Sequence, residues 1–368
     1  MRILYVTTIS LTMNSFFKPH IDMLVREGHQ VDIACNYNDL PLDKLYSDLG
    51  CIFYQIDFSR SPLSKSNLKA YGQLKKVIEN GNYDIVHCHT PNAAVITRLV
   101  SGRFRRKNGL KVFYTAHGFH FYKGAPKLNW MVYYPIEKFC SRFTDKLITI
   151  NKEDYELAKT KFKAKEVHYV PGVGIDLSRF ENVQVDRSAK RREIGVPDDA
   201  ILLFSVGELN ENKNHQVIIR ALAKLNNPKL HYAIAGVGDN RDCLLMLSEE
   251  LGVSEQVHLI GYRKDVAELY AIADLFCFPS LREGLSVSLM EAMASRLPVM
   301  CSSIRGNVDL LNCVQDFMFD PLNTDQCETA LRKLLASDRD LVARTNADHV
   351  AAFSKESVII KMREVYGL

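Results

Sequence analysis

Short apolar runs alternate along the whole chain with longer stretches in which apolar residues recur every three or four positions. The short runs, rich in Val and Ile, predict buried strands, and the longer stretches predict amphipathic helices between them. In the first half, the expected strands are residues 3–7, 31–35, 51–56, 85–88, 111–116, 146–150 and 167–170. One helix is expected at residues 16–27, where Gly28 terminates it, and another at residues 68–79. This alternation is typical of a parallel sheet covered by helices.

A change of pattern near residue 171 divides the chain. Pro171, Gly172 and Gly174 precede a polar, charged stretch that runs to about residue 199 and predicts a hinge and linker. A second series of strands is then expected at residues 201–206, 232–235, 257–260, 275–278 and 298–301. We therefore predict an α/β fold of two Rossmann-like domains facing across a cleft, with ligands at the carboxyl ends of the strands. The expected domains are residues 1–178 and 179–352, followed by a C-terminal helix at 353–368.

The composition supports a globular protein and shows an uneven charge. Apolar residues make up 47% and charged residues 24% of the 368 positions, which excludes extended disorder and collagen. The net charge of +4 conceals a difference between the two halves. Residues 1–180 carry 26 Lys and Arg against 16 Asp and Glu, whereas the remainder carries 21 against 27. The first half is therefore the part expected to meet an anionic partner.

The cysteines and the apolar runs bear on location. The nine cysteines include no C-x-x-C pair and mostly lie in apolar runs, which is typical of reduced thiols in the cytoplasm. The first residues read as a strand rather than as a secretory signal. Because no apolar run approaches the roughly 18 residues of a membrane span, any membrane contact is expected to be peripheral.

Two glutamates frame the most informative segment. A buried strand ends at Pro279, Glu283 and Gly284 lie in the loop that follows, and a helix is expected to open near Leu285. The free N–H groups of a helix N-terminus bind phosphate well. Glu291 would lie about 9 Å further along the helix axis, so the two carboxylates cannot share one task. The alternative is that both glutamates are ordinary surface residues.

Two further loops follow expected strands. Gly207 lets the backbone approach a ligand, and Lys213 offers a positive charge to a diphosphate, unless it is simply a solvated lysine. In the other half, His117 precedes Gly118 directly after an apolar strand and is placed to donate to a phosphate or a sugar hydroxyl. His120 is expected to be packed in its aromatic loop. We expect no metal site, because no carboxylate or cysteine completes a ligand set with these histidines.

A basic run is the largest local contributor to the positive charge of the first half. Arg103, Arg105, Arg106 and Lys107 follow one another closely and would attract anionic lipid head groups. Nucleic acid is the competing partner, but the chain has no recognised nucleic-acid module, so we expect none. A solvated helix end is the remaining alternative.

In combination, these motifs resemble those of the retaining nucleotide-sugar glycosyltransferases of family four, which have two Rossmann domains in the GT-B fold. The resemblance covers nearly the whole chain and rests on residues 206–213, 235–238, 261–266 and 278–291. Residues 115–124, 148–151 and 171–176 are similar to the branch that builds bacterial capsular polysaccharide and exopolysaccharide on a lipid carrier. Two departures are an acid, Glu208, where the family usually has an arginine, and the lack of paired glycines at residues 9–15.

The resemblance implies catalytic roles for His117, Glu283 and Lys213 and donor-binding roles for Gly207, Arg263, Leu285, Ser286 and Glu291. Glu291 would bind the donor ribose, Glu283 the sugar near its C3 and C4 hydroxyls, and Lys213 the diphosphate. The backbone of Leu285 and Ser286 would hold the distal phosphate. Arg263 would lie against the nucleobase, and His117 would contact the sugar near the reacting centre.

The expected activity is that of a metal-independent hexosyltransferase without a cofactor. It would move a hexose or N-acetylhexosamine, with retention, from a nucleoside-diphosphate sugar, first of all a UDP-sugar, to a lipid-diphosphate-linked saccharide. Acceptors would bind to the first domain and the nucleotide sugar to the second. The expected place is the cytoplasm, at the inner face of the cell membrane. The alternative is a catalytically silent subunit that binds a nucleotide sugar within a glycosyltransferase complex. The helix at 353–368 either crosses back to the first domain, as in the family, or packs on the second.

Overall fold

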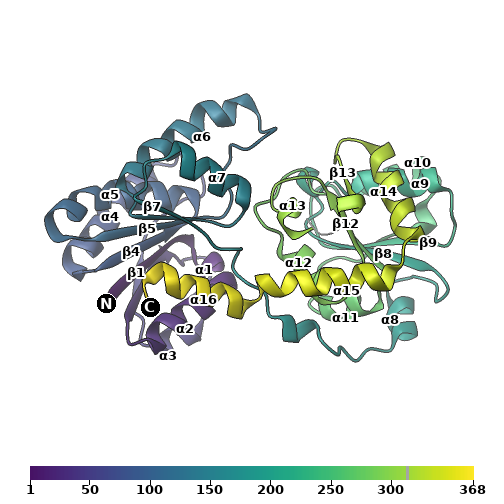
Figure 1. Cartoon of the computed structure of the whole chain (residues 1–368), viewed down its shortest axis with the longest axis horizontal. Coiled ribbons are helices and arrows are strands. Elements are labelled where there is room, and N and C mark those ends of the chain that lie inside the picture. The colour runs from purple at the N-terminus through teal and green to yellow at the C-terminus, as the bar shows by residue number, and fades with distance from the viewer. Residues whose placement is uncertain (312–314) are drawn as a thin grey trace. The chain divides into compact units, whose positions relative to one another are not determined.

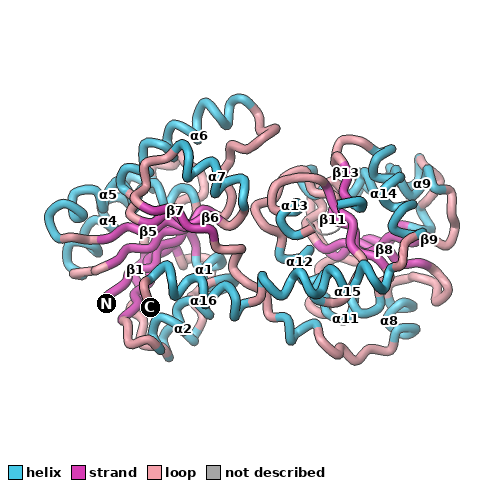
Figure 2. Tube along the Cα trace, in the orientation of Figure 1, coloured by secondary structure: helices cyan, strands magenta, loops and turns pink. Residues whose placement is uncertain are grey.

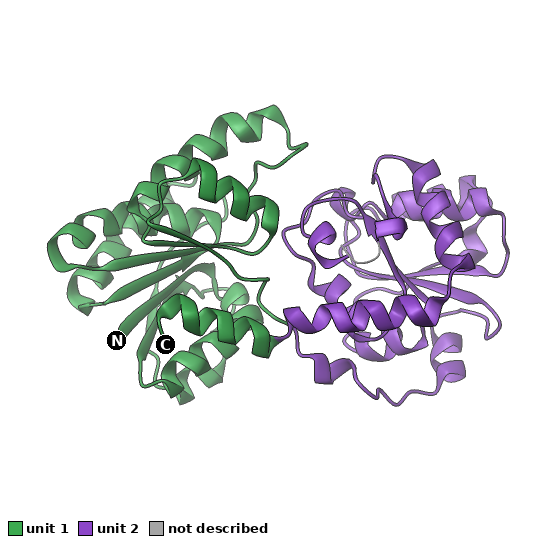
Figure 3. Ribbon diagram, viewed as in Figure 1, with its two compact units in different colours: residues 1–174, 355–368 green, residues 175–354 purple. Residues whose placement is uncertain are grey.

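The computed structural model describes residues 1–311 and 315–368, and the chain divides into two compact units (Figure 3). The first unit comprises Met1–Gly174 and Lys355–Leu368, and the second comprises Ile175–Ser354. The first boundary thus lies four residues before the expected one, and the second lies two residues after it.

The first unit is built on a seven-stranded parallel sheet with the order β3-β2-β1-β4-β5-β6-β7 (Figures 1 and 2). Its strands are β1 (Arg2–Ile9), β2 (Gln30–Asn36), β3 (Phe53–Gln55), β4 (Ile85–His89), β5 (Lys111–Ala116), β6 (Lys146–Thr149) and β7 (Glu166–Tyr169). Its helices are α1 (Ser10–Phe16), α2 (Lys18–Arg26), α3 (Lys44–Asp48), α4 (Ser66–Gly81), α5 (Pro91–Asn108), α6 (Lys127–Cys140), α7 (Lys152–Lys161) and α16 (Lys355–Tyr366), with a 3₁₀ turn at Ser141–Phe143.

Both faces of this sheet are buried. In β1, Ile3 and Tyr5 belong to the core under α2 and α16, whereas Leu4 and Val6 belong to the core under α4 and α5. Successive side chains of a strand point to opposite faces, so a strand covered on both sides must be apolar throughout. This explains why the strands of the chain read as continuous apolar runs.

The helix expected at residues 16–27 is α2, which begins two residues later than predicted and follows the separate helix α1 after the buried Phe17. Pro19 occupies the first turn of α2, where its missing N–H costs nothing, whereas inside a helix that began earlier its ring would clash with the preceding turn. The expectation of one helix was therefore wrong at its start.

The C-terminal helix α16 packs on the first sheet. Val358, Met362 and Val365 are buried in the same core as β1 and α2. The hydroxyl of Tyr366 is 2.6 Å from Nδ1 of His87 in β4. Of the two places that the sequence left open for this helix, the structure has the one on the first unit.

The second unit is a six-stranded parallel sheet with the order β10-β9-β8-β11-β12-β13. Its strands are β8 (Ile201–Val206), β9 (Leu230–Ala235), β10 (Val257–Leu259), β11 (Leu275–Phe278), β12 (Val299–Ser302) and β13 (Met318–Phe319). Its helices are α8 (Arg187–Glu193), α9 (His215–Leu225), α10 (Arg241–Glu250), α11 (Val266–Ile272), α12 (Val287–Ala294), α13 (Asn307–Leu310), α14 (Thr324–Ala336) and α15 (Arg339–Val350). Shorter 3₁₀ turns lie at Leu177–Phe180, Glu211–Lys213, Ser254–Gln256, Gln315–Phe317 and Ala351–Phe353. The expectation of two Rossmann-like α/β domains is confirmed.

The stretch expected to be a hinge and linker contains the boundary between the units, after Gly174, and also a helix. Residues 187–193 form α8, and the buried Arg191 pairs with Asp274 at 2.7 Å and donates to the carbonyl of Ile272. Lys190 pairs with Asp265 at 2.9 Å. The charge of this segment is therefore used in ion pairs that attach α8 to its own unit, which composition alone does not reveal.

No helix in the described residues is both long enough and apolar enough to cross a bilayer.

Candidate functional site

Two loops at the carboxyl edge of the second sheet are joined by hydrogen bonds. One follows β8 and the other follows β11. The carbonyl of Asn212 accepts from the N–H of Leu281 at 2.8 Å, and Asn212 Nδ2 donates to the carbonyl of Arg282 at 3.1 Å. Asn214 Nδ2 donates to the carbonyl of Pro279. The two loops that carry the predicted site residues of this unit are thus held together.

Lys213 and Glu283 form an ion pair across these loops. Lys213 Nζ lies 2.7 Å from Glu283 Oε1 and 4.9 Å from the ring centre of Phe278. The two side chains are 21% and 16% exposed, so each remains within reach of a ligand. The interpretation of Glu283 as an ordinary solvated loop residue does not fit this contact.

Two glycines permit close approaches at this edge. A Cβ on Gly207 would lie 3.1 Å from the side chain of Lys213 in the same loop, so the lysine packs directly on this glycine. A Cβ on Gly306, where φ is +79°, would lie 2.1 Å from the carbonyl oxygen of Gly284. A side chain at position 306 would therefore displace the loop that carries Glu283, whereas one at position 207 would only shift the side chain of Lys213. Together with the ion pair, these contacts bring Gly207, Lys213 and Glu283 into one cluster.

The helix expected to bind phosphate begins later than predicted. Helix α12 begins at Val287, and Ser286 is its N-cap, with Oγ accepting from the N–H of Leu289 at 3.3 Å. Serine is a favoured N-cap, and this was the signal for the true start. Leu285 and Ser286 therefore lie just before the helix rather than in its first turn. The N-terminal end of α12 still directs its dipole and N–H groups to this edge.

Glu291 lies on α12 in a different environment from Glu283. It is largely buried, and Tyr270 of α11 donates its hydroxyl to Glu291 Oε2 at 3.2 Å and to the carbonyl of Ser288 at 3.1 Å. Burial raises the pKa of the Glu291 carboxyl. The two glutamates have different partners, which fits separate tasks. No motif in the sequence points to Tyr270, which only the packing of α11 brings to Glu291.

Arg263 forms ion pairs with two acids. Its Nε lies 2.8 Å from Asp265 Oδ1, and its Nη2 also contacts Glu193. The hydrogen bond to Asp265 raises the pKa of Arg263, and that of Asp265 is lowered by the same contact. The expected contact of Arg263 with a nucleobase stays a prediction.

The acid that departs from the family pattern is engaged locally. Glu208 is exposed, and its Oε2 accepts from Asn210 Nδ2 at 2.7 Å. Arg305, which the sequence analysis did not identify, is nearly buried and donates from Nε to the carbonyl of Glu283 at 3.1 Å. A positively charged group thus reaches this loop from the segment after β12 rather than from the position beside Gly207.

His117 of the first unit belongs to a group of packed rings. Its Nε2 is 3.3 Å from Nδ1 of His89, and the ring of His89 packs on Phe17 with centres 4.2 Å apart. Burial lowers the pKa of His117 to about 4, and that of His20 in α2 falls to about 4 mainly for the same reason. His117 is therefore uncharged near neutral pH. In residues 1–311 and 315–368, no three side chains are placed to hold a metal ion.

A strained residue marks the same edge of the first sheet. Thr90 has φ 63° and ψ 140°, a rare conformation for a β-branched residue. Its Oγ1 accepts from the N–H of Thr8 at 3.0 Å and lies 2.7 Å from Thr8 Oγ1. Strained residues concentrate at functional sites. Pro91 at the start of α5, directly after a histidine-rich strand, was the sequence signal for this turn.

The aromatic loop and the basic run are partly structural. The ring of His120 stacks on Tyr133 with centres 4.7 Å apart, as expected for a packed residue. Arg105 pairs with Asp145 through two hydrogen bonds of 2.8 and 2.7 Å. Arg105 thus joins α5 to the residue before β6, and a contact of this residue with lipid stays a prediction. Arg103, Arg106 and Lys107 are exposed.

Comparisons with known proteins agree with this architecture. Residues 186–348 match the family described as Glycosyl transferases group 1, and residues 2–151 match Glycosyl transferase 4-like. The putative glycosyltransferase EpsD of Bacillus subtilis is 39% identical over 316 residues, which cover 84% of this chain and 81% of EpsD.

A second relative and a solved structure extend the likeness. An Escherichia coli UDP-Gal:α-D-GlcNAc-diphosphoundecaprenol α-1,3-galactosyltransferase is 26% identical, with 81% of this chain and 77% of that enzyme covered. The crystal structure of Anabaena Alr3699/HepE in complex with UDP superposes with a TM-score of 0.80 at 17% identity over the full length of both chains, which bears on the fold alone. The chain belongs to the family-four glycosyltransferases of the GT-B fold, in the bacterial exopolysaccharide branch, and it is an enzyme.

Proposed function

We propose that the enzyme transfers a hexose or N-acetylhexosamine, with retention, from a UDP-sugar to a saccharide linked to a lipid diphosphate. Transfer takes place at the inner face of the cell membrane. The relative from Escherichia coli is named for a UDP-linked donor and a diphosphoundecaprenol acceptor, which supports both choices. The donor belongs to the second unit and the acceptor to the first.

The observation that carries the proposal is the 2.7 Å ion pair between Lys213 and Glu283. Without a ligand, Glu283 neutralises the ammonium group. A nucleoside diphosphate brings stronger negative charge to the same place, next to the N-terminal end of α12, and competes for Lys213. Glu283 is then free to accept hydrogen bonds from sugar hydroxyls. The ion pair thus positions both side chains before the donor binds, and it balances the charge of Lys213.

The proposed chemistry requires little more than this charge. The bond between the sugar and the diphosphate breaks while the acceptor hydroxyl bonds to the same face of the sugar. The leaving phosphate oxygen takes up the acceptor proton. Lys213 and the N–H groups of α12 stabilise the negative charge that grows on the diphosphate, which is the usual main source of such catalysis. His117, uncharged, supplies a neutral hydrogen-bonding group to the sugar.

The basic residues of the first unit suit a membrane-bound acceptor. Arg103, Arg106 and Lys107 are exposed at the end of α5 and gain about 1 kcal/mol each near an anionic surface. We expect the enzyme to bind anionic vesicles. This binding should weaken when salt is added and when these three residues are replaced by Gln. Arg105 is left in place because it is structural.

The function is tested by incubation with UDP- and GDP-sugars and a polyprenyl-diphosphate saccharide, with products identified by mass and their anomeric configuration by NMR. We expect UDP to be released only when an acceptor is present. The new glycosidic bond should have the same anomeric configuration, axial or equatorial, as the bond in the donor. Release of GDP alone, or an inverted linkage, contradicts the proposal. Lack of turnover with every pair would favour a silent binding subunit.

A further inference from the structure

The first unit contains a cavity of about 580 Å³ between α5 and α6. Its other walls are the loop after β5 and residues 62–67. The lining side chains are mostly apolar and include Leu63, Val95, Ile96, Leu128, Val132 and Ile136. This volume is within the range of roughly 300–1,000 Å³ of small-molecule sites. We call it the α5–α6 cavity.

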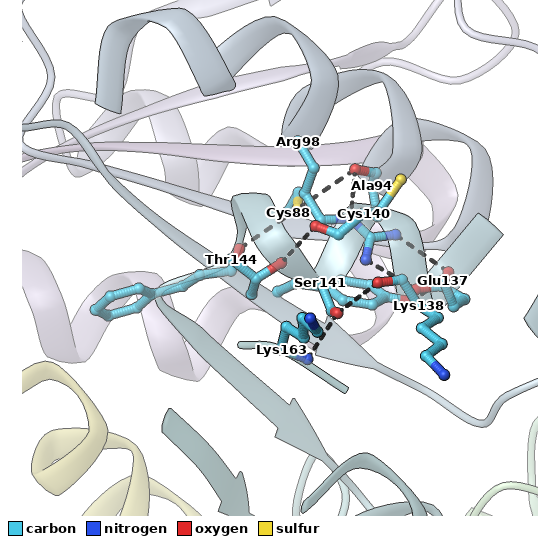
Figure 4. Close-up of polar contacts among 11 residues, drawn as sticks. Cys88, Ala94, Arg98, Glu137, Lys138, Cys140, Ser141, Thr144 and Lys163 are labelled. Atoms are coloured by element: carbon cyan, nitrogen blue, oxygen red, sulfur yellow. Dashed lines mark hydrogen bonds and ion pairs between the residues drawn. The ribbon is translucent and has the colours of Figure 1, made fainter. Parts of the chain in front are cut away.

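The charged groups of its floor are already satisfied. Glu137 of α6 accepts from Arg98 of α5 at 2.8 and 3.1 Å, and Arg98 Nε donates to the carbonyl of Ala94 (Figure 4). The guanidinium also lies over the ring of Tyr114, 4.1 Å from its centre. Both charged residues are buried. This pair fixes the spacing of the two helices and presents no free charge to an occupant.

Exposed apolar side chains line the cavity, and the segments that carry them also carry positively charged residues. Leu63 is 94% exposed and Leu128 is 67% exposed, although both line the cavity. Large apolar side chains that remain in water at the rim of an apolar cavity mark a binding site. Lys65 and Lys127 are their neighbours in sequence, and Arg60 lies near the start of α5, where Asn92 donates to its carbonyl. Within the described part of the chain, none of the three pairs with an acid.

We propose that the α5–α6 cavity binds the hydrocarbon chain of the lipid-diphosphate acceptor next to its head group. The walls offer few hydrogen-bonding groups, so a sugar or a nucleotide would lose its hydration there without compensation. A hydrocarbon chain gains from the same walls. The positively charged residues of the adjoining segments, Arg60, Lys65 and Lys127, suit the diphosphate that follows the chain. The inference rests on the proposed function and adds to it the place where the enzyme recognises lipid.

The test compares two acceptors that carry the same saccharide diphosphate, one on a long isoprenoid chain and one on a propyl group. Val132→Trp fills the cavity, while Met131→Trp is the matched control on the same helix, because Met131 is 74% exposed and does not line the cavity. We expect Val132→Trp to raise the KM for the long-chain acceptor at least 10-fold. The KM values for the propyl acceptor and for the donor should stay within twofold of the wild type. The melting temperature should stay within a few degrees.

Equal effects of Val132→Trp and Met131→Trp would overturn the inference, because they would indicate adsorption to the lipid phase rather than occupation of the cavity. The same holds if the wild type uses both acceptors equally well. A binding assay with a fluorescent polyprenyl diphosphate separates this inference from the proposed function. If the wild type binds the polyprenyl diphosphate, Val132→Trp does not, and no transfer is found, the cavity is supported and the proposed function is contradicted. If transfer is found without any preference for chain length, the proposed function is supported and the role of the cavity is contradicted.

Discussion

The carboxyl edges of the two sheets differ in the kind of group they present. In the second unit, the edge has an ammonium–carboxylate pair, Lys213 and Glu283, and a buried carboxyl, Glu291. In the first unit, the edge has rings that stay uncharged near neutral pH, among them His117 and His89. A diphosphate donor requires charge for its recognition, whereas a sugar hydroxyl requires neutral hydrogen-bonding groups. The contrast indicates that one Rossmann-like fold, used twice, can present two different kinds of binding group.

The largest expected effect concerns the buried charges of the first unit, which serve stability rather than binding. Glu137→Gln leaves the Arg98 guanidinium buried without its anion, and we expect a loss of about 3–5 kcal/mol in the free energy of unfolding. Chemical denaturation measures it. The double variant Arg98→Met with Glu137→Leu should recover most of the loss. Lys224→Ala, which breaks an exposed pair with Asp325, should cost only about 0–1 kcal/mol. A Glu137→Gln variant as stable as the wild type would contradict this distinction.

The second largest effect concerns the charges of the second unit. Lys213→Ala should reduce kcat by about 10²–10³-fold, because the positive group nearest the leaving diphosphate is lost. Lys213→Arg keeps the charge and should retain a measurable part of the activity. Steady-state release of UDP measures both, with circular dichroism as the check that the fold is intact. If Lys213→Ala turned over at the rate of the wild type, neither Lys213 nor its ion pair with Glu283 would have a role in the mechanism.

A smaller effect follows from the uncharged histidines. The folded-state pKa values of His20 and His117 are about 4, below the value of about 6.5 in the unfolded chain. Between these values the unfolded chain binds more protons, so stability falls as the pH falls from about 6.5 to 4. Each such histidine contributes a slope of about 1.4 kcal/mol per pH unit. His20→Phe should reduce the slope by about that amount, and an unchanged slope would mean that His20 is charged in the folded protein.

Local sequence was sufficient for most of the fold but not for its interruptions. The apolar runs located strands such as β1 and β11, because a buried parallel strand must be apolar on both faces. The strand β13 has two residues, too few to give a pattern. Pro19 and Ser286 carried the correct signals for the starts of α2 and α12, but helical periodicity suggested earlier starts.

Contacts over long sequence distances were not predictable. The family resemblance pointed to Lys213 and Glu283 separately, yet only the folded sheet shows that they pair with each other over 70 positions. In the same way, the sequence could not show that Arg105 forms an ion pair with Asp145 while Arg103, Arg106 and Lys107 remain exposed. A run of like charges indicates an anionic partner only after the internal ion pairs have been identified.

The most direct test of the contrast between the two edges is a calorimetric titration of UDP into Lys213→Ala and His117→Ala, measured side by side with the wild type. We predict that Lys213→Ala weakens UDP binding at least 10-fold, because the diphosphate loses its positive partner. His117→Ala should bind UDP within twofold of the wild type, because the uncharged histidine belongs to the other unit and is proposed to contact the sugar, which UDP lacks. Equal losses in both variants, or a loss only in His117→Ala, would contradict the account.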